Sequence, residues 1–345
     1  MRNTKNQLFF IILLLVIILL SLSGCGAVIP FFKNKEPERV SNLPPSAVFI
    51  DSKAIRAQFI SLLKEAEEAI FIELAALDDP EIVNLLVERS RAGVEVKILL
   101  DQWQRENTST VKYLKNQNIS VQYYPTQKGQ YQRVRYLVVD YKKALFLGQD
   151  LLKKLSQTHS LAFKLTGKTA WNIAKSFAKD WEYTTTLALS LPNNIELAED
   201  NITFALNQNV KQQILNAIAK ASSTIEVEVE KISEYETVQA LIAAKQKGCE
   251  VRIIVNSSCA EATPNTIATL KEAGIEVRYY QSSPEKSLYL NIGIFDQKTI
   301  VMSCSSWSYN SFVINHEGSL TIPSPQVVKK IYSVFEQDWK AATPA

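Results

Sequence analysis

Two arginines near the middle of the chain have the types and spacing that suit chemistry on an anion. Arg133 and Arg135 alternate along a predicted strand, so both side chains lie on one face. Two adjacent guanidinium groups offer planar forks of donors that fit a phosphate or a carboxylate. Pairing with Asp or Glu, or simple solvation, accounts for the same pattern. The sequence leaves these readings open.

The charge balance narrows the class of partner. The chain has 345 residues, 38 Lys and Arg against 35 Asp and Glu, and 46% hydrophobic residues. A nearly neutral globular protein lacks the dense basic surface that bulk nucleic-acid binding needs, so no nucleic-acid partner is predicted. Four Cys and two His leave little room for a zinc site of the Cys/His type. We therefore predict no metal and no cofactor.

The first residues read as an export signal. Arg2 and Lys5 precede an apolar run that ends at Leu20, and this run is too short for the ~30 Å hydrocarbon core. Leu22-Ser23-Gly24-Cys25 resembles the lipobox of bacterial lipoproteins, which implies cleavage before Cys25 and a lipid on its thiol. We expect a signal peptide at 1–24, a tether at 25–46, and anchoring to the cell membrane, or to an outer membrane if there is one. An uncleaved signal anchor is the alternative.

The remainder of the chain is a tandem duplication. Ile70-Phe71-Ile72-Glu73 matches Ile225-Glu226-Val227-Glu228, and the pattern Phe-x-x-Asp-Trp at 177–181 recurs at 335–339. Asp140 and Asp296 are also equivalent. Collinear matches at an offset of about 155 residues define two units. We call them lobe 1 (47–190) and lobe 2 (200–345).

Each lobe alternates helices and strands. Apolar residues recur at helical spacing over 52–68, and short apolar strands are predicted at 94–100 and 251–255. The predicted fold is α/β, with a mostly parallel sheet in each lobe flanked by helices. We expect the two lobes to pair about a pseudo-twofold axis and to form one cleft between them.

This order of elements resembles the phospholipase D superfamily. The resemblance rests on Gly93-Val94-Glu95-Val96-Lys97-Ile98-Leu99-Leu100-Asp101, on Val138-Val139-Asp140-Tyr141-Lys142, and on the Phe-x-x-Asp-Trp pattern. In that family each lobe carries His-x-Lys and, four residues later, Asp. One His is the nucleophile and the other the general acid, while the Lys pair holds the phosphate.

Here both motifs are degenerate. Counting back from each Asp, the two His positions hold Arg133 and Tyr289, and the two Lys positions hold Arg135 and Asn291. The family's Asn-x-Glu pair remains only in lobe 2. We assign no catalytic residue with confidence. The motif positions are Arg133, Arg135, Asp140, Tyr289, Asn291 and Asp296, and the ligand-binding candidates are Arg133, Arg135, Tyr289, Asn291, Asn315 and Glu317.

The two histidines are equivalent in the repeat, at positions 159 and 316. If Asn315 and Glu317 face the cleft as in the family, the period of a strand turns His316 to the opposite face. We therefore expect both histidines to be half-buried residues with backbone partners. We also interpret the two motif aspartates as residues that favour tight turns through their own side chains.

Three functions follow for comparison. The favoured one is a membrane-anchored pseudoenzyme whose cleft binds an anionic, phosphate-bearing ligand, such as a phospholipid head group or another phosphodiester, or an envelope partner. The second is an active phosphodiesterase or phosphatidyltransferase of the phospholipase D type with substituted catalytic residues, Tyr289 attacking and Glu317 supplying the proton. The third is a structural docking module. The accessibility of Arg133 and Arg135 separates the first from the third.

Overall fold

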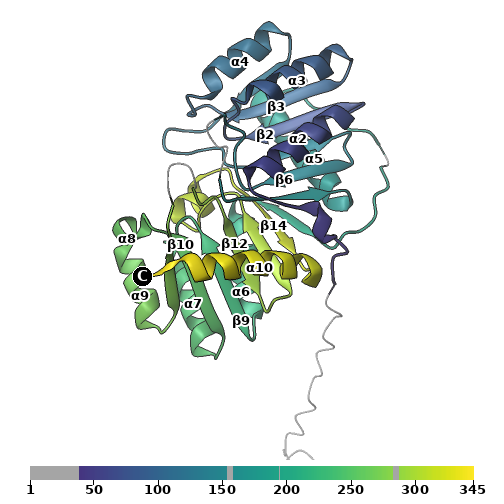
Figure 1. Ribbon diagram of the computed structural model, residues 1–345. Helices are drawn as coiled ribbons and strands as arrows, with labels where there is room; N and C mark the ends of the chain where they lie inside the picture. The colour runs from purple at the N-terminus through teal and green to yellow at the C-terminus, as the bar shows by residue number, and fades with distance from the viewer. Residues whose placement is uncertain (1–38, 154–157, 194, 283–286) are drawn as a thin grey trace, which may run out of the picture. The chain divides into compact units, whose positions relative to one another are not determined.

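The chain folds into two α/β lobes, each built on one sheet (Figure 1). In the computed structural model, residues 39–153, 158–193, 195–282 and 287–345 are described. The elements of lobe 1 and its N-terminal flank are η1 (Pro45–Ala47), β1 (Val48–Ile50), α2 (Ser52–Glu65), β2 (Ala69–Leu74), α3 (Pro80–Arg91), β3 (Glu95–Asp101), α4 (Asn107–Asn116), β4 (Ser120–Tyr124), β5 (Tyr136–Val139), β6 (Lys143–Leu147), β7 (Leu161–Leu165) and α5 (Lys168–Thr185).

Lobe 2 repeats this order and has three additional elements. Its elements are β8 (Thr203–Leu206), α6 (Gln208–Lys220), β9 (Thr224–Val229), α7 (Tyr235–Gln246), β10 (Glu250–Asn256), α8 (Cys259–Ala262), α9 (Pro264–Glu272), β11 (Glu276–Tyr280), β12 (Asn291–Phe295), β13 (Thr299–Ser303), the π-helix η2 (Asn310–Ile314), β14 (Gly318–Ile322), α10 (Pro325–Ala341) and β15 (Thr343–Pro344). The additional elements are α8, η2 and β15.

Both sheets are mixed, so the prediction of mostly parallel sheets is wrong. The strand orders are β1-β7-β6-β5-β2-β3-β4 and β15-β11-β10-β9-β12-β13-β14-β8. In lobe 1 only β2–β3 and β3–β4 are parallel pairs. The other half of the sheet is antiparallel because β5 and β6 are joined by a tight turn, which forces the chain to reverse. Lobe 2 has the same division.

Alternation along the central strands separates two cores in each lobe. On β2, Ile70 and Ile72 pack under α2 and α3, while Phe71 and Glu73 face the other side, where α5 lies. The apolar faces of α5 and α10 join one continuous core that contains Phe177 of lobe 1 and Phe335 of lobe 2. The two lobes therefore share an inner core. Each lobe also has its own outer core. As predicted, the Phe and Trp side chains of the two Phe-x-x-Asp-Trp patterns, on α5 and α10, are buried in the core.

The lobes are also joined by two reciprocal backbone pairings. The amide of Arg133 donates to the carbonyl of His316 at 2.7 Å, and the amide of Tyr289 donates to the carbonyl of His159 at 2.8 Å. Each histidine amide in turn donates to the opposite lobe, and both pairings are isolated parallel bridges. Equivalent positions exchange equivalent bonds, which is the signature of the predicted pseudo-twofold relation.

The N-terminal predictions fall largely outside the described residues. The signal peptide at 1–24 and Cys25 lie outside them altogether. Of the predicted tether, the part from Ser41 on belongs to the folded body, because Ser41 is buried and its amide donates to the carbonyl of Pro323. Across the described ranges, no helix combines the length and the apolar character that a membrane crossing needs.

Candidate functional site

The motif arginines of lobe 1 have different environments. Arg135 is 4% exposed, and its Nε lies 3.0 Å from Oδ1 of Asp150. Its Nη1 also donates to the backbone carbonyl of Cys304 in lobe 2. Arg133 is half-buried, and its guanidinium lies over the ring of Tyr131 with 4.9 Å to the ring centre. The prediction of two arginines side by side on a ligand is therefore wrong for Arg135, whose donors and charge are used inside the protein.

The motif positions of lobe 2 are polar and uncharged. Asn291 is buried, and its Oδ1 accepts a hydrogen bond from the amide of Glu230 at 3.1 Å. Tyr289 is half-buried and its amide is held by the opposite lobe. Neither residue reproduces the histidine or the lysine of the family motif.

The two motif aspartates have a structural role that differs from the predicted one. Asp140 and Asp296 do sit in tight turns, with φ of 49° and 50°. Their carboxylates, however, accept hydrogen bonds from the amides that lead into the neighbouring strand, residues 67–69 and 222–224 respectively. Each aspartate thus fastens its hairpin turn to the start of a central strand. Since this needs only a carboxylate and three amides, it is independent of catalysis.

The Asn-x-Glu pair of lobe 2 is divided between two surroundings. Oδ1 of Asn315 accepts from the amide of Tyr131 at 3.1 Å, so Asn315 supports the junction of the lobes and is not a free ligand-binding group. Glu317 is completely buried. Burial raises the pKa of Glu317 to about 7, although the Ser305 hydroxyl and the Arg135 guanidinium act in the opposite direction.

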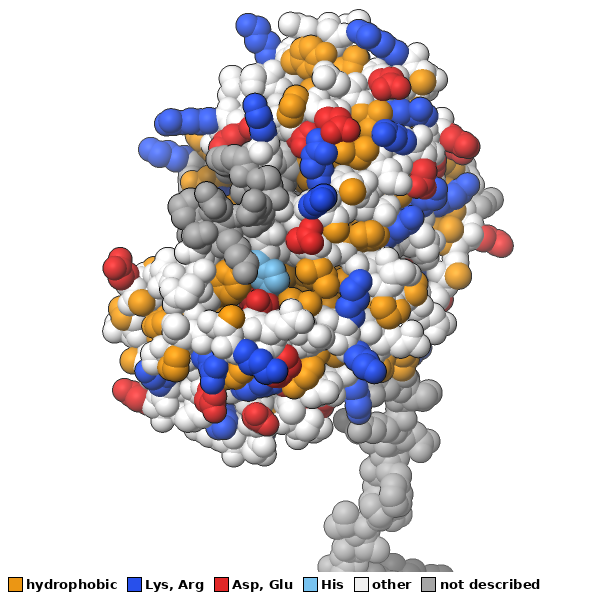
Figure 2. Space-filling model, viewed as in Figure 1, with side chains coloured by type: hydrophobic (Ala, Val, Ile, Leu, Met, Phe, Trp, Pro, Cys, Tyr) orange, Lys and Arg blue, Asp and Glu red, His pale blue; other side chains and the backbone are white. Residues whose placement is uncertain are grey.

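Carboxylates surround the one motif arginine that is partly exposed. Glu230 directly follows β9. The loss of water around its carboxyl group raises the pKa of Glu230, and the charges of Arg135 and Arg133 act in the opposite direction. Arg133 has the same effect on Asp101, whose pKa is also raised by burial. Arg133 therefore has both acidic neighbours, Glu230 and Asp101, and a basic one, Arg135. On the face shown in Figure 2, basic and acidic side chains are likewise interspersed over both lobes.

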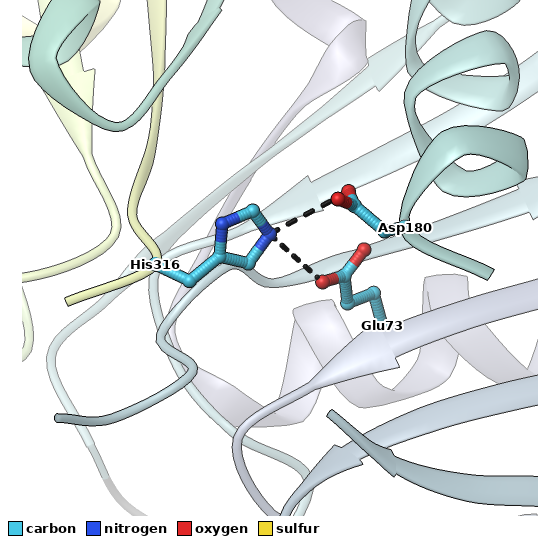
Figure 3. Close-up of side chains that lie close together, drawn as sticks. All are labelled: Glu73, Asp180 and His316. Atoms are coloured by element: carbon cyan, nitrogen blue, oxygen red, sulfur yellow. Dashed lines mark ion pairs between the residues drawn. The ribbon is translucent and has the colours of Figure 1, made fainter. Parts of the chain in front are cut away.

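The histidines pair with carboxylates of the opposite lobe, so the prediction of backbone partners for their side chains is wrong. Nε2 of His316 lies 3.2 Å from Oε1 of Glu73 and 3.5 Å from Oδ2 of Asp180 (Figure 3). We call these three residues the first cluster. Its counterpart, the second cluster, consists of His159, Glu228 and Asp338. His316 and Glu317 have different surroundings, but Asn315 and Glu317 do not share one face as the prediction assumed, because β14 begins only at Gly318.

Both clusters are buried at the boundary of the lobes, and each stacks on a tyrosine. The ring of His316 lies parallel to Tyr124 at 4.4 Å, and that of His159 lies parallel to Tyr280 at 5.7 Å. Sequence reasoning used Glu73 and Glu228 only as markers of the repeat. A carboxylate at the same place in two buried strands was the signal that these residues have a buried partner.

A cavity of about 290 Å³ lies in lobe 1, and Asp150, the partner of Arg135, is one of the residues that line it. Arg56, which lines it, is already paired with Asp79 at 2.6 Å and with Glu81 at 2.6 Å. The residues lining the cavity are Ser52, Lys53, Arg56, Asp79, Gln149, Asp150, Leu151, Leu152 and Lys153.

The chain has two lobes with the same α/β topology, and the comparison with known proteins gives the class of this fold. The family model described as "Cardiolipin synthase, PLD-like domain" matches residues 59–150 and 214–339. The chain belongs to this phospholipase D-like family.

Curated relatives and a solved structure agree with this assignment. The chain is 23% identical over 133 residues to the mitochondrial cardiolipin hydrolase of Danio rerio, a match over 39% of this chain and 58% of that relative. The chain thus spans less than two thirds of that relative's length. It is 21% identical over 349 residues to the cardiolipin synthase of Clostridium perfringens (strain SM101 / Type A), covering 86% of this chain and 70% of the relative.

The phosphatidylserine synthase of Haemophilus influenzae Rd KW20 has the same fold. The two structures superpose with a TM-score of 0.65 at 14% sequence identity, and the match covers 88% of each chain. This similarity confirms the predicted fold class of two paired phospholipase D-like lobes.

Proposed function

We propose that this protein is a lipid-anchored, non-hydrolysing member of the phospholipase D-like family. It would bind the phosphate-bearing head group of an anionic phospholipid at the motif positions, with Arg133 as the contacting cation. The observation that carries the proposal is the replacement of both motif histidines, by Arg133 and Tyr289. If it were active, its reaction would be the phosphodiester cleavage or phosphatidyl transfer of the family.

The residues at the motif positions do not supply the nucleophile or the pair of phosphate-binding cations that the family reaction uses. A guanidinium stays protonated at physiological pH, so Arg133 is no nucleophile. Arg135 cannot hold a transferring phosphate while it is buried against Asp150 and the carbonyl of Cys304. Oδ1 of Asn291 accepts from a backbone amide, and the side chain carries no positive charge. Loss of the nucleophile and the cations removes the groups that lower the barrier.

Support for a phospholipid ligand comes from the relatives and from Arg133. The names of the relatives include cardiolipin and phosphatidylserine, two phospholipids. Arg133 is only partly buried, whereas Arg135 is buried. The lipobox-like segment ending at Cys25 would anchor the chain to a membrane. The phospholipid ligand would then lie in that same membrane.

A second candidate is a rewired phosphodiesterase. It is favoured by Tyr289, a half-buried hydroxyl-bearing residue at a position that holds the nucleophile in the family, together with the remaining Glu317. In that case Tyr289 would attack phosphorus and Glu317 would protonate the leaving oxygen.

One set of assays tests both candidates. The full chain is assayed for hydrolysis of a chromogenic phosphodiester and of phosphatidylglycerol and cardiolipin, beside Tyr289→Phe. Binding of a soluble short-chain phosphatidylglycerol is measured by calorimetry in the wild type, in Arg133→Gln, and in the matched control Arg105→Gln, whose arginine is exposed elsewhere in lobe 1.

We expect no turnover, and binding that is lost in Arg133→Gln and kept in Arg105→Gln. Turnover that disappears in Tyr289→Phe would replace the proposal by the second candidate. An absence of both turnover and binding would leave the docking module as the function to test.

A further inference from the structure

The first cluster has the ligand types and spacing of a metal site. In a tetrahedral zinc site, bonds of about 2.0–2.1 Å place neighbouring ligand atoms about 3.3 Å apart. Nε2 of His316 lies 3.2 Å from Oε1 of Glu73 and 3.5 Å from Oδ2 of Asp180 (Figure 3). All three ligand atoms lie within 4.8 Å of one another. The geometry points to a divalent cation of the zinc class bound by Glu73, Asp180 and His316.

The ring of His316 is oriented as a metal-binding histidine is. Its Nδ1 lies 2.9 Å from Oδ1 of Asn207, an acceptor, so Nδ1 carries a proton and donates it. Nε2 is the ring nitrogen that faces the two carboxylates, so a cation bound there would take the place of the proton on Nε2. Histidines that bind metals characteristically donate their other ring nitrogen in this way.

Glu73 is held from behind by two donors. The hydroxyl of Tyr136 donates to Oε2, and Nε2 of Gln132 donates to Oε1 at 3.1 Å. Such outer hydrogen bonds orient a ligating carboxylate. The completely buried carboxylate of Glu73 is thus held with Oε1 at 3.2 Å from Nε2 of His316.

Two polar atoms of the cluster are left without a hydrogen bond. Nε2 of His316 and Oδ2 of Asp180 are both buried, and neither makes a contact with hydrogen-bond geometry, although Nε2 is within ion-pair distance of both carboxylates. Buried polar atoms are normally satisfied, and each exception needs an explanation. A cation between them satisfies both, and two carboxylates neutralise its charge.

The second cluster provides an internal comparison because its geometry differs. Nε2 of His159 lies only 2.7 Å from Oδ2 of Asp338, an ordinary hydrogen bond, and 3.8 Å from Oε1 of Glu228. Leu288 and Ile292 stand where lobe 1 has Gln132 and Tyr136, so no donor orients Glu228. Both oxygens of Glu228 lack a hydrogen bond, and burial raises its pKa well above the usual range. A protonated Glu228 beside a hydrogen-bonded pair accounts for the second cluster without a metal.

The prediction that the chain holds no metal rested on its few Cys and His. The first cluster needs one His because two carboxylates complete it. Its ligands come from β2, α5 and the segment before β14, so a bound cation would fasten lobe 1 to lobe 2. Three protein ligands leave a fourth position for water.

The test measures metal binding by the full chain. Chelator-treated protein is titrated with Zn²⁺ and with Co²⁺, whose visible absorption reports coordination by protein ligands. Metal content is determined by mass spectrometry after dialysis. The ligand variants are Glu73→Gln and His316→Gln. The matched controls Glu228→Gln and His159→Gln make the same changes in the second cluster.

We expect one equivalent of metal, a cobalt spectrum in the wild type and both controls, and at least about 100-fold weaker binding in the ligand variants. The variant Tyr136→Phe removes only a donor to Glu73 and keeps the proposal testable if a ligand variant does not fold. It is expected to weaken binding by about 10- to 100-fold. No cobalt spectrum in the wild type, unchanged affinity in Tyr136→Phe, or loss of binding in Glu228→Gln would each overturn the proposal.

Discussion

Asp296 offers a direct test of whether the remaining motif residues are structural. Its carboxylate accepts hydrogen bonds from the amides of Ser222, Ser223 and Thr224, at 2.7 to 3.1 Å, and from two serine hydroxyls. The variant Asp296→Asn keeps the size of the side chain. Asparagine also tolerates the φ of 50° found at this position. The change therefore removes the charge and one acceptor oxygen but leaves the turn intact.

The expected loss follows from the pKa of Asp296. Burial by itself would raise this pKa, but the hydrogen bonds from Ser223, Thr224 and Ser222 outweigh it and lower the pKa from 3.8 to about 2. At about 1.4 kcal/mol per pKa unit, this shift corresponds to about 2 kcal/mol. Because the turn is partly exposed and solvent screens the interaction, we expect the ionised carboxylate to contribute about 1 kcal/mol to the free energy of unfolding. Because the pKa is lowered in the folded state, this contribution is complete above about pH 4 and is lost as the pH falls towards 2.

The assay is urea unfolding followed by tryptophan fluorescence at a series of pH values. At pH 7 we expect the free energy of unfolding of Asp296→Asn to be about 1 kcal/mol lower than that of the wild type. The gap should shrink between pH 4 and pH 2, where the wild type itself becomes protonated. Glu272→Gln, an exposed change in the same lobe, controls for the loss of one charge. Equal stability at pH 7, or a gap that persists at pH 2, would refute the reasoning.

Three further changes test the description of the site and the cores. Arg135→Ala leaves Asp150 buried without its partner and should cost about 3–5 kcal/mol in urea unfolding, whereas Arg133→Ala loses one partly exposed contact with a ring and should cost less than about 1 kcal/mol. Phe335→Ala removes a completely buried ring from the inner core and should lower the free energy of unfolding by about 3–5 kcal/mol, measured in the same way. The free, buried thiols of lobe 2 should not react with Ellman's reagent in the native protein and should all react in urea; they are Cys249, Cys259 and Cys304.

The architecture was predictable because the duplication repeats the spacing of the core. Ile70 and Ile72 recur as Ile225 and Val227, and each pair packs on the outer face of its sheet. Strand direction was less predictable. Periodicity shows which residues share a face, but it does not show whether a later strand returns beside β2 in the same or the opposite sense. The tight turn at Asp140 was predicted, and it makes β5 and β6 antiparallel neighbours.

The identity of the motif positions was predictable, but their partners were not. Oδ1 of Asp150 lies 3.0 Å from Nε of Arg135, although the two residues are fifteen positions apart in the chain. The carbonyl that Arg135 binds belongs to Cys304 of the other lobe. Pairings of this kind depend on how the lobes meet. The histidine clusters were missed for the same reason, since each histidine finds its carboxylates across the boundary of the lobes.

The junction between the lobes is built largely from groups other than the side chains at the two histidine positions of the motif. The two bonds that cross the boundary beside the motif use backbone atoms of Arg133 and Tyr289, and a backbone bond forms whichever side chain is attached. The inner core around Phe177 and Phe335 and the clusters of His159 and His316 hold the lobes through residues outside the motif. The backbone bonds are thus compatible with any side chain at positions 133 and 289, whereas the side chain of Arg135 adds a bond of its own to the carbonyl of Cys304 in lobe 2. In the proposed role, that paired scaffold presents Arg133 to a ligand.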